Sequence, residues 1–287
     1  MMSGWRNMTY RLAVIVLATT GLPVMAQWLN YKETGVPRTK DGKVSLSAPA
    51  PRTSNGKADF SGVWMVEPST HEEYRKLLGD NFETFDVPGN EVTGLSKYII
   101  DILADFKHDE EPLRPEAARL LGERVANPGA GTPSSHCLPG GVPWATFIPP
   151  FKMIQAPREI VMLHEDNNPP RQIYIDGRKP PTSIDLPSWV GYSAGNWEGD
   201  TLVVDTVGFN DRGWLDAFGH PRSEDLHIIE RFTRRDFGHM DIGITIDDPK
   251  MYTRSFTIKV SAVLLPDTDV LEAVCAENEK DLAHMAK

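Results

Sequence analysis

Positive charge and cysteine are both scarce in this chain of 287 residues. It has 30 lysines and arginines against 40 aspartates and glutamates, a formal net charge of −10, and only two cysteines. A surface that binds nucleic acid needs a basic excess to neutralise phosphates, so we expect no nucleic-acid partner. With 40% hydrophobic and 24% charged residues the composition is that of a globular protein, which excludes extended disorder and a fibrous protein.

Several motifs with known chemistry are also missing. The chain has no Gly-x-Ser-x-Gly nucleophile elbow, no glycine-rich loop for phosphate and no His-Glu-x-x-His pair. Its histidines show no recognised spacing of metal ligands; those that could meet in the fold are His164, His220, His227 and His239. We therefore predict no metal site and no cofactor.

Long apolar runs are confined to the N-terminus. Residues 1–26 are typical of a secretory signal peptide, because two arginines precede the apolar stretch Leu12–Leu22 and Ala26 lies at the cleavage site. That stretch is shorter than the ~20 residues of a spanning helix, so a retained membrane anchor is the less favoured alternative. We expect a periplasmic or secreted protein that begins at Gln27 and has no membrane span.

Export gives the two cysteines a structural meaning. In an oxidising compartment an even pair such as Cys137 and Cys275 forms a disulfide more often than two free thiols. The bridge would tie the start of the β-rich half to its last strand and contribute about 4–5 kcal/mol in the chain-entropy model. Two buried thiols are the alternative.

The domain plan that we expect has three parts: the signal peptide at 1–26, a polar extended arm at 27–57, and a single barrel domain at 58–287. A first strand at 60–66 precedes a helical insertion at 70–127. Three patterns predict helices there: the capping box of Thr70 and Glu73, the apolar stripe Leu95, Ile99, Leu103 and Phe106, and Pro115 at the start of a segment with Leu120, Leu121 and Val125.

From Phe151 to Cys275 the pattern is that of short antiparallel strands separated by turn signals. The predicted strands are 151–155, 159–165, 171–176, 189–196, 200–207, 226–235, 239–246, 254–260 and 269–275. Gly62-Val63-Trp64 matches the Gly-x-Trp that begins the first strand of lipocalin-like barrels. We therefore predict a mainly β fold, an antiparallel lipocalin-like β-barrel, with a β-sandwich as the alternative.

Two predicted strands carry an acid in an apolar phase. Glu230 follows Leu226 and Ile228, and Asp205 lies between Val203 and Val207. A buried lone carboxylate is costly, so each of these acids is either ion-paired or faces a wet cavity. Arg231, Arg234 and Arg254 are the expected partners of Glu230 if it is paired, and Arg231 is otherwise a candidate for binding an anionic ligand.

The connection between those two strands is the strongest functional candidate. Residues 208–225 are far longer than a hairpin loop, and such loops usually carry function or are disordered. His220 has the right ordinary pKa for proton transfer, and Asp216 lies four residues before it as an orienting partner. Asp211, Trp214 and, from a neighbouring strand, Tyr192 would shape the binding site. The alternative is a packed Ω-loop that only closes the end of the barrel.

Long motifs in the second half of the chain resemble those of a large family of exported bacterial proteins from soil and other environments. They are Trp-Glu-Gly-Asp-Thr-Leu-Val-Val at 197–204, Gly-Phe-Asn-Asp at 208–211, Trp-Leu-Asp at 214–216, Gly-His-Pro at 219–221, Glu-Arg at 230–231, Asp-Phe-Gly-His-Met at 236–240, Thr-Ile-Asp-Asp-Pro-Lys at 245–250 and Cys-Ala-Glu-Asn-Glu-Lys-Asp at 275–281. The similarity covers residues 136–282, and Arg222 departs from it where many relatives have histidine. It implies export and a shared barrel, and it assigns no activity.

Three functions fit these patterns. In the first, the barrel encloses a small, partly apolar organic molecule and performs cofactor-independent acid–base chemistry of the lyase, isomerase or hydrolase type. His220, Asp216 and Glu230 would be catalytic, and Asp211, Trp214, Tyr192, Arg231 and Asp205 would contact the substrate. In the second, the same cavity serves a periplasmic carrier without catalysis. In the third, the insertion meets a partner protein. The sequence does not decide the oligomeric state.

Overall fold

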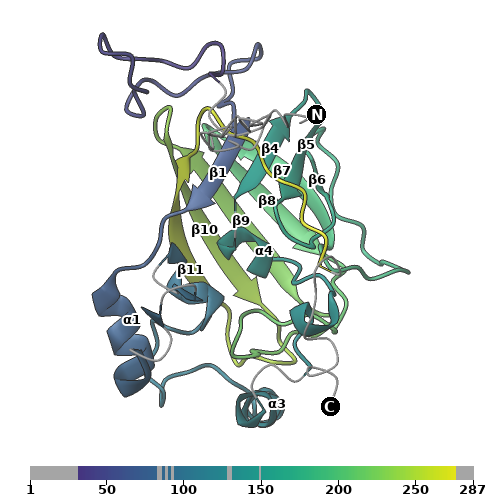
Figure 1. Ribbon diagram of the computed structural model, residues 1–287. Coiled ribbons are helices and arrows are strands. Elements are labelled where there is room, and N and C mark those ends of the chain that lie inside the picture. Colours follow the sequence, from purple (N-terminus) through teal and green to yellow (C-terminus); the bar gives the residue numbers. More distant parts are fainter. Residues whose placement is uncertain are drawn as a thin grey trace, which may run out of the picture.

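Nine strands close into a barrel in the computed structural model, which describes residues 32–82, 86–87, 90–91, 94–127, 131–148 and 150–275. Their order around the barrel is β1-β11-β10-β9-β8-β7-β6-β5-β4 (Figure 1). The strands are β1 Gly62–Val66, β4 Phe151–Gln155, β5 Glu159–His164, β6 Arg171–Tyr174, β7 Tyr192–Glu198, β8 Thr201–Val207, β9 His227–Arg234, β10 His239–Asp247 and β11 Phe256–Leu264. The predicted mainly β barrel is therefore confirmed, and the sandwich alternative is wrong.

One neighbouring pair departs from the predicted antiparallel pattern. β6 and β7 are parallel, with Ile173 opposite Ser193, whereas every other neighbouring pair in the barrel is antiparallel. Strand directions cannot alternate all the way round a closed ring of nine, so at least one parallel pair is required. The long connection 175–191 carries the chain back to the starting end of β6 before β7 begins.

Alternating side chains of the strands build the core. In β10 the buried residues are Met240, Ile242, Ile244 and Ile246, as the sequence pattern predicts. In β8 the buried residues are Leu202, Val204 and Thr206, which is the opposite phase to the one inferred from Val203, Asp205 and Val207. That inference was wrong because valine occurs on both faces of this strand, so the pattern did not identify the inner face.

One end of the barrel is closed by Trp64, Arg234 and the N-terminal arm. Trp64 is fully buried in β1 and its indole Nε1 donates to the carbonyl of Phe60 at 2.9 Å. The Arg234 guanidinium lies 4.8 Å from the Trp64 ring and donates to the carbonyls of Asp59 and Phe237. The arm, described from residue 32, reaches this end and accepts two backbone hydrogen bonds, at Leu46 and Ala48.

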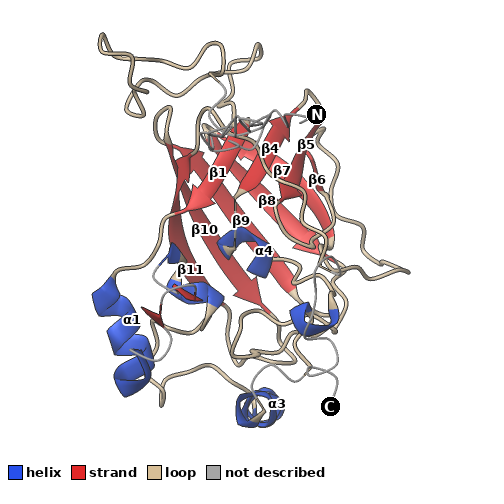
Figure 2. Ribbon diagram, in the orientation of Figure 1, coloured by secondary structure: helices blue, strands red, loops and turns tan. Residues whose placement is uncertain are grey.

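The other end is covered by the insertion and by loops (Figure 2). Its helices are α1 His71–Leu78, the 3-10 turn η3 Lys97–Ile99, α3 Pro115–Ala126 and α4 Trp144–Phe147, and a short ribbon pairs β2 Asp86–Val87 with β3 Asn90–Glu91. The Thr70 capping box and the Pro115 start are confirmed. Of the apolar residues expected to pack in the third helix, Val125 is 52% exposed.

The continuous helix predicted from the stripe Leu95 to Phe106 is wrong. Only η3 forms there, followed by turns, although Ile99 and Leu103 are buried as the stripe requires. The carbonyls of Ile99 and Ile100 accept hydrogen bonds from Ala217 and Phe218 in the long loop. These backbone groups therefore bind another segment rather than continuing a helix.

The predicted disulfide is present, with Cys137 and Cys275 joined across 138 residues of sequence. The strand predicted at 269–275 is wrong, because no strand forms after β11 in the described chain, and the bridge ties this non-strand segment to the loop before α4. The segment is held by side chains instead, among them Lys152 to Asp269 at 2.7 Å. Among the helices described, none has the length and apolarity needed to cross a bilayer.

Candidate functional site

The loop between β8 and β9, residues 208–226, is packed against the insertion at one end of the barrel. Besides the two backbone bonds from Ala217 and Phe218, the amide of Ile102 donates to the Asp216 carboxylate at 2.6 Å. Leu215 and Asp216 are fully buried, and Trp214 is almost so. The loop is thus an ordered cover whose position depends on residues 99–102.

Within this loop the structure brings the two predicted catalytic residues, Asp216 and His220, into direct contact. Nδ1 of His220 lies 2.5 Å from Oδ2 of Asp216, and both side chains are buried. The other Asp216 oxygen accepts the backbone amides of Gly219 and His220. Nε2 of His220 is buried and has no hydrogen-bond partner among the described residues. The carboxylate therefore orients the ring and leaves one nitrogen unused.

A third group, Asp101, joins this pair and was missed by the sequence reasoning. Its Oδ1 lies 3.9 Å from Nδ1 of His220, and its side chain is 15% exposed. The sequence did contain a signal, because Asp101 interrupts the apolar run Tyr-Ile-Ile-Asp-Ile-Leu at 98–103. The sequence reasoning used Ile99 and Leu103 of this run for a helical stripe and drew nothing from the acid between them.

The three groups perturb one another's ionisation. Burial raises the pKa of Asp101 to about 6, although the nearby His220 opposes the shift. Burial alone would lower the pKa of His220, but the Asp216 carboxylate outweighs it and raises the pKa above its ordinary value. The site thus holds a carboxyl whose pKa of about 6 is close to neutral pH, beside an imidazole whose pKa is raised, and perturbed groups of this kind are typical of proton-transfer sites.

Asp101 also lines a pocket of about 480 Å³ on the outer side of the insertion. Leu77, Ala104 and Phe106 supply apolar wall, and Lys97 and Asp105 supply charge. Lys97 bridges Asp105 at 2.6 Å and Glu73 at 3.0 Å. Burial would raise the pKa of Asp105, but hydrogen bonds from Lys97 and Tyr98 keep it below its ordinary value. Asp101 is therefore a carboxyl of this pocket whose raised pKa, about 6, suits proton transfer at neutral pH.

Asp101, Asp216 and His220 are also the one group in the described part of the chain with the spacing of a metal site, their ligand atoms lying within 4.8 Å of one another. The absence of a metal site remains a prediction. The hydrogen bonds of Asp216 support that prediction. Its two oxygens already accept four hydrogen bonds, from three backbone amides and from the His220 ring. A cation would have to displace at least one of these donors.

Glu230, predicted as a third catalytic group, lies elsewhere. It is fully buried inside the barrel and pairs bidentately with Arg171, whose Nη1 lies 3.0 Å from Oε1. The expected partners Arg231, Arg234 and Arg254 were wrong, because Arg171 reaches across the interior from β6. Ser193 and Thr206 bind the same guanidinium at 3.1 and 2.9 Å. No hydrogen bond or ion pair connects Glu230 with His220 or Asp216 among the described residues.

Asp205 and Arg231 point away from the barrel interior. Asp205 accepts from Nε2 of His227 at 2.7 Å, and its side chain is 41% exposed. Arg231 pairs with Glu198 at 2.6 Å on the outer surface of β9. The structure does not bring either residue to the Asp216–His220 pair, and both belong to ion pairs on the barrel wall.

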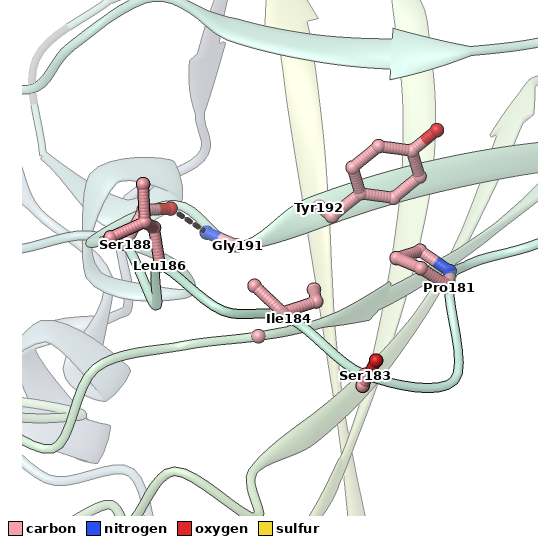
Figure 3. A pocket seen from close by; sticks show the side chains of 8 residues that line it. Pro181, Ser183, Ile184, Leu186, Ser188, Gly191 and Tyr192 are labelled. Atoms are coloured by element: carbon pink, nitrogen blue, oxygen red, sulfur yellow. Dashed lines mark hydrogen bonds between the residues drawn. The ribbon is translucent and has the colours of Figure 1, made fainter.

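Tyr192 lines a separate pocket of about 310 Å³ on the side of the barrel. Figure 3 shows its ring together with Pro181 and Ile184 from the connection before β7. Leu186, at 86% exposure, is the most exposed large apolar side chain of the described chain. The residues that line this pocket include no carboxylate, histidine, lysine or arginine. The pocket can therefore hold a partly apolar molecule, and the Tyr192 phenol is its one titratable group.

Asp211 lines a third pocket, and Trp214 packs under the guanidinium of Arg124, another residue of that lining. This pocket, about 410 Å³, is on the outer side of the long loop and is lined by α3 and by Arg222. Arg222 is buried and donates to the carbonyls of Asn210, Val142 and Trp189. It joins three loops at this end of the barrel.

No family model, curated protein or solved structure matches the chain. The candidate site therefore rests on the geometry of its own residues.

Proposed function

We propose that this protein is an exported enzyme that binds a small, partly apolar organic molecule beside Asp101 and transfers a proton to or from it. The observation that carries the proposal is the pocket next to a carboxyl with a pKa of about 6, backed by a buried histidine that a second carboxylate orients. The export part rests on the predicted signal peptide and on the resemblance to exported bacterial proteins.

Each residue has a distinct role in this proposal. Asp101 is the catalytic residue, because it is the member of the trio that lines the pocket. With a pKa of about 6 it is mostly ionised at pH 7, so it can accept a proton and then return it. His220 and Asp216 are positioning residues, since their charges adjust the ionisation of Asp101 and their hydrogen bonds hold the loop over it.

The reaction class follows from these groups. Proton abstraction and return at one carboxyl is the chemistry of isomerases and lyases, and it needs no redox partner. Leu77, Ala104 and Phe106 would hold the apolar part of the substrate, and Lys97 would bind a polar substituent. Hydrolysis, in which Asp101 activates a water molecule, is the third class, and the masses of the products separate the three.

The test is to incubate the oxidised protein with a pooled library of small organic molecules and to follow substrates and products by mass spectrometry. Asp101→Asn should lower turnover by about 10²–10⁴-fold, the usual contribution of a general acid or base. Asp105→Asn is the matched control, because it alters a carboxylate of the same pocket whose pKa is lowered rather than raised. Turnover that survives in Asp101→Asn would contradict the proposal.

A carrier function is the second candidate, and the pocket beside Tyr192 favours it. Its lining is apolar and hydroxylic, with no carboxylate, histidine, lysine or arginine. A compound retained by the protein without any product, and displaced by Tyr192→Ala, would indicate a carrier and remove the catalytic role of Asp101.

A further inference from the structure

The pocket between α3 and the long loop is a second candidate site, and Asp101 is not part of it. It has a volume of about 410 Å³ and lies between α3 and the loop segment 211–224, with residues 250–251 at its edge. Leu120, Pro221 and Met251 provide apolar surface. Arg124, Arg222 and Lys250 provide positive charge on the same lining.

Arg124 is a cation without an anionic partner. Its Nη1 donates to the carbonyl of Gly219 at 2.6 Å, and its guanidinium lies 4.6 Å from the centre of the Trp214 ring. No carboxylate of the described chain lies within 4.0 Å of it. One turn earlier on the same helix, Arg119 is paired with both Glu116 and Glu123 at 2.6 Å. Arg124 therefore keeps several N–H groups available beside the pocket.

Arg222 also has no carboxylate of the described chain in contact, and it is buried, at 2% exposure. All its hydrogen-bond acceptors are neutral oxygens: the carbonyls of Asn210, Val142 and Trp189 and the Asn210 side-chain oxygen. Burial lowers the pKa of Arg222 to about 10 and lowers that of Arg124 as well. The charges of Asp216 and Glu123 favour the charged form of Arg124, and that of Asp211 favours the charged form of Arg222, but burial outweighs them. Two desolvated guanidiniums with no carboxylate in contact are costly, and a bound anion would offset that cost.

We infer that this pocket binds a small organic carboxylate, with its anionic group on Arg124 and its apolar body against Leu120 and Met251. Arg222, which also lines the pocket, adds positive potential. Lys250 is already paired with Asp225 at 3.0 Å. Asp211 and Glu224 also line the pocket, but both are exposed to solvent, where their charges are screened. A carboxylate suits Arg124 because a guanidinium can bind both of its oxygens.

Isothermal titration of the full protein with benzoate, octanoate and inorganic phosphate tests the inference. We expect saturable binding of at least one carboxylate, weakened by added salt, and weakened at least about tenfold in Arg124→Gln. Arg119→Gln is the matched control and should bind as the unchanged protein does. Because Arg124→Gln also loses the bond to Gly219, Leu120→Glu serves as a second variant: it puts a negative charge on the apolar wall and should weaken binding to a similar extent.

Three results would overturn the inference. The first is no saturable binding of either carboxylate to the unchanged, folded protein. The second is binding that both Arg124→Gln and Leu120→Glu leave unaltered while their thermal unfolding shows an intact fold. The third is phosphate binding as tightly as the carboxylates, which would mean that the pocket recognises charge alone. Asp101→Asn should not change the affinity, so failure of the proposed catalytic function and failure of this site are distinguishable.

Discussion

The protein has two clusters of buried charge, and they differ in how completely their polar atoms are paired. The Arg171–Glu230 cluster is inside the barrel, where both carboxylate oxygens meet the guanidinium and two hydroxyls bind it as well. The Asp101–Asp216–His220 cluster is at the barrel end. There Nε2 of His220 has no partner among the described residues, and Asp101 lines a pocket.

This difference in pairing indicates that the Arg171–Glu230 cluster is structural and that the Asp101–Asp216–His220 cluster is the functional candidate. A buried ion pair in which every nitrogen and oxygen has a partner fixes the relative positions of β6 and β9. An incompletely paired cluster with a raised carboxyl pKa is costly for stability, and such costs concentrate at functional sites. Substitutions in and beside the two clusters test this distinction, and Glu230→Gln should change the unfolding free energy most and Arg231→Gln least.

Glu230→Gln should have the largest effect, because it leaves the Arg171 charge buried without its anion. Removal of one partner of a buried pair costs about 3–5 kcal/mol, and denaturant unfolding measures it. Replacement of both residues, as Arg171→Met with Glu230→Leu, should recover much of the loss. If Glu230→Gln changed stability by less than about 1 kcal/mol, the pair would not be the structural cluster described here.

Asp216→Asn should destabilise the protein by a smaller amount, about 1–3 kcal/mol. The new amide would face the N–H groups of Ile102 and His220, so one buried donor would lose its acceptor. Hydrogen exchange of the Ile102, Gly219 and His220 amides should then increase, because these amides donate to Asp216. Unchanged protection of all three would show that this carboxylate does not hold the loop in place.

Much of the barrel was predictable from the sequence, because alternating polarity and turn signals are local properties of the chain. The errors have common physical causes. Ile99 and Ile100 carry a helical stripe, yet their carbonyls bind Ala217 and Phe218 of a distant segment. Glu230 was recognised as buried, but its partner Arg171 comes from a strand 59 residues earlier. Long-range pairing of this kind leaves no trace in a local pattern.

The candidate site was predictable only in its local part. Asp216 and His220 are four residues apart in one loop, so their contact could be expected from spacing alone. Asp101 meets them from a segment more than a hundred residues away, and only its position within an apolar run marked it as unusual. The histidine of the trio was thus identified without the carboxyl that lines the pocket.

Asp101→Asn distinguishes the two clusters by the sign of its effect, since it should stabilise the protein at neutral pH. The folded-state pKa of about 6 exceeds the ordinary value of 3.8, so the folded protein binds more protons between these values. Stability from this group is therefore present below about pH 4 and is lost as the pH rises through about 6. The variant should exceed the unchanged protein by about 1–3 kcal/mol at pH 7 and by little at pH 4. An equal difference at both pH values would contradict the raised pKa.

Arg231→Gln should have the smallest effect, although it breaks an ion pair at the residue next to Glu230. Arg231 and Glu198 are 49% and 60% exposed on the outer face of the barrel, whereas Arg171 and Glu230 are 1% and 0% exposed. Exposed pairs contribute below about 1 kcal/mol, because water solvates both charges before and after the change. Denaturant unfolding of Arg231→Gln beside Glu230→Gln thus compares two ion pairs from adjacent positions of β9 that differ mainly in burial. A loss comparable to that of Glu230→Gln would mean that burial is not what separates them.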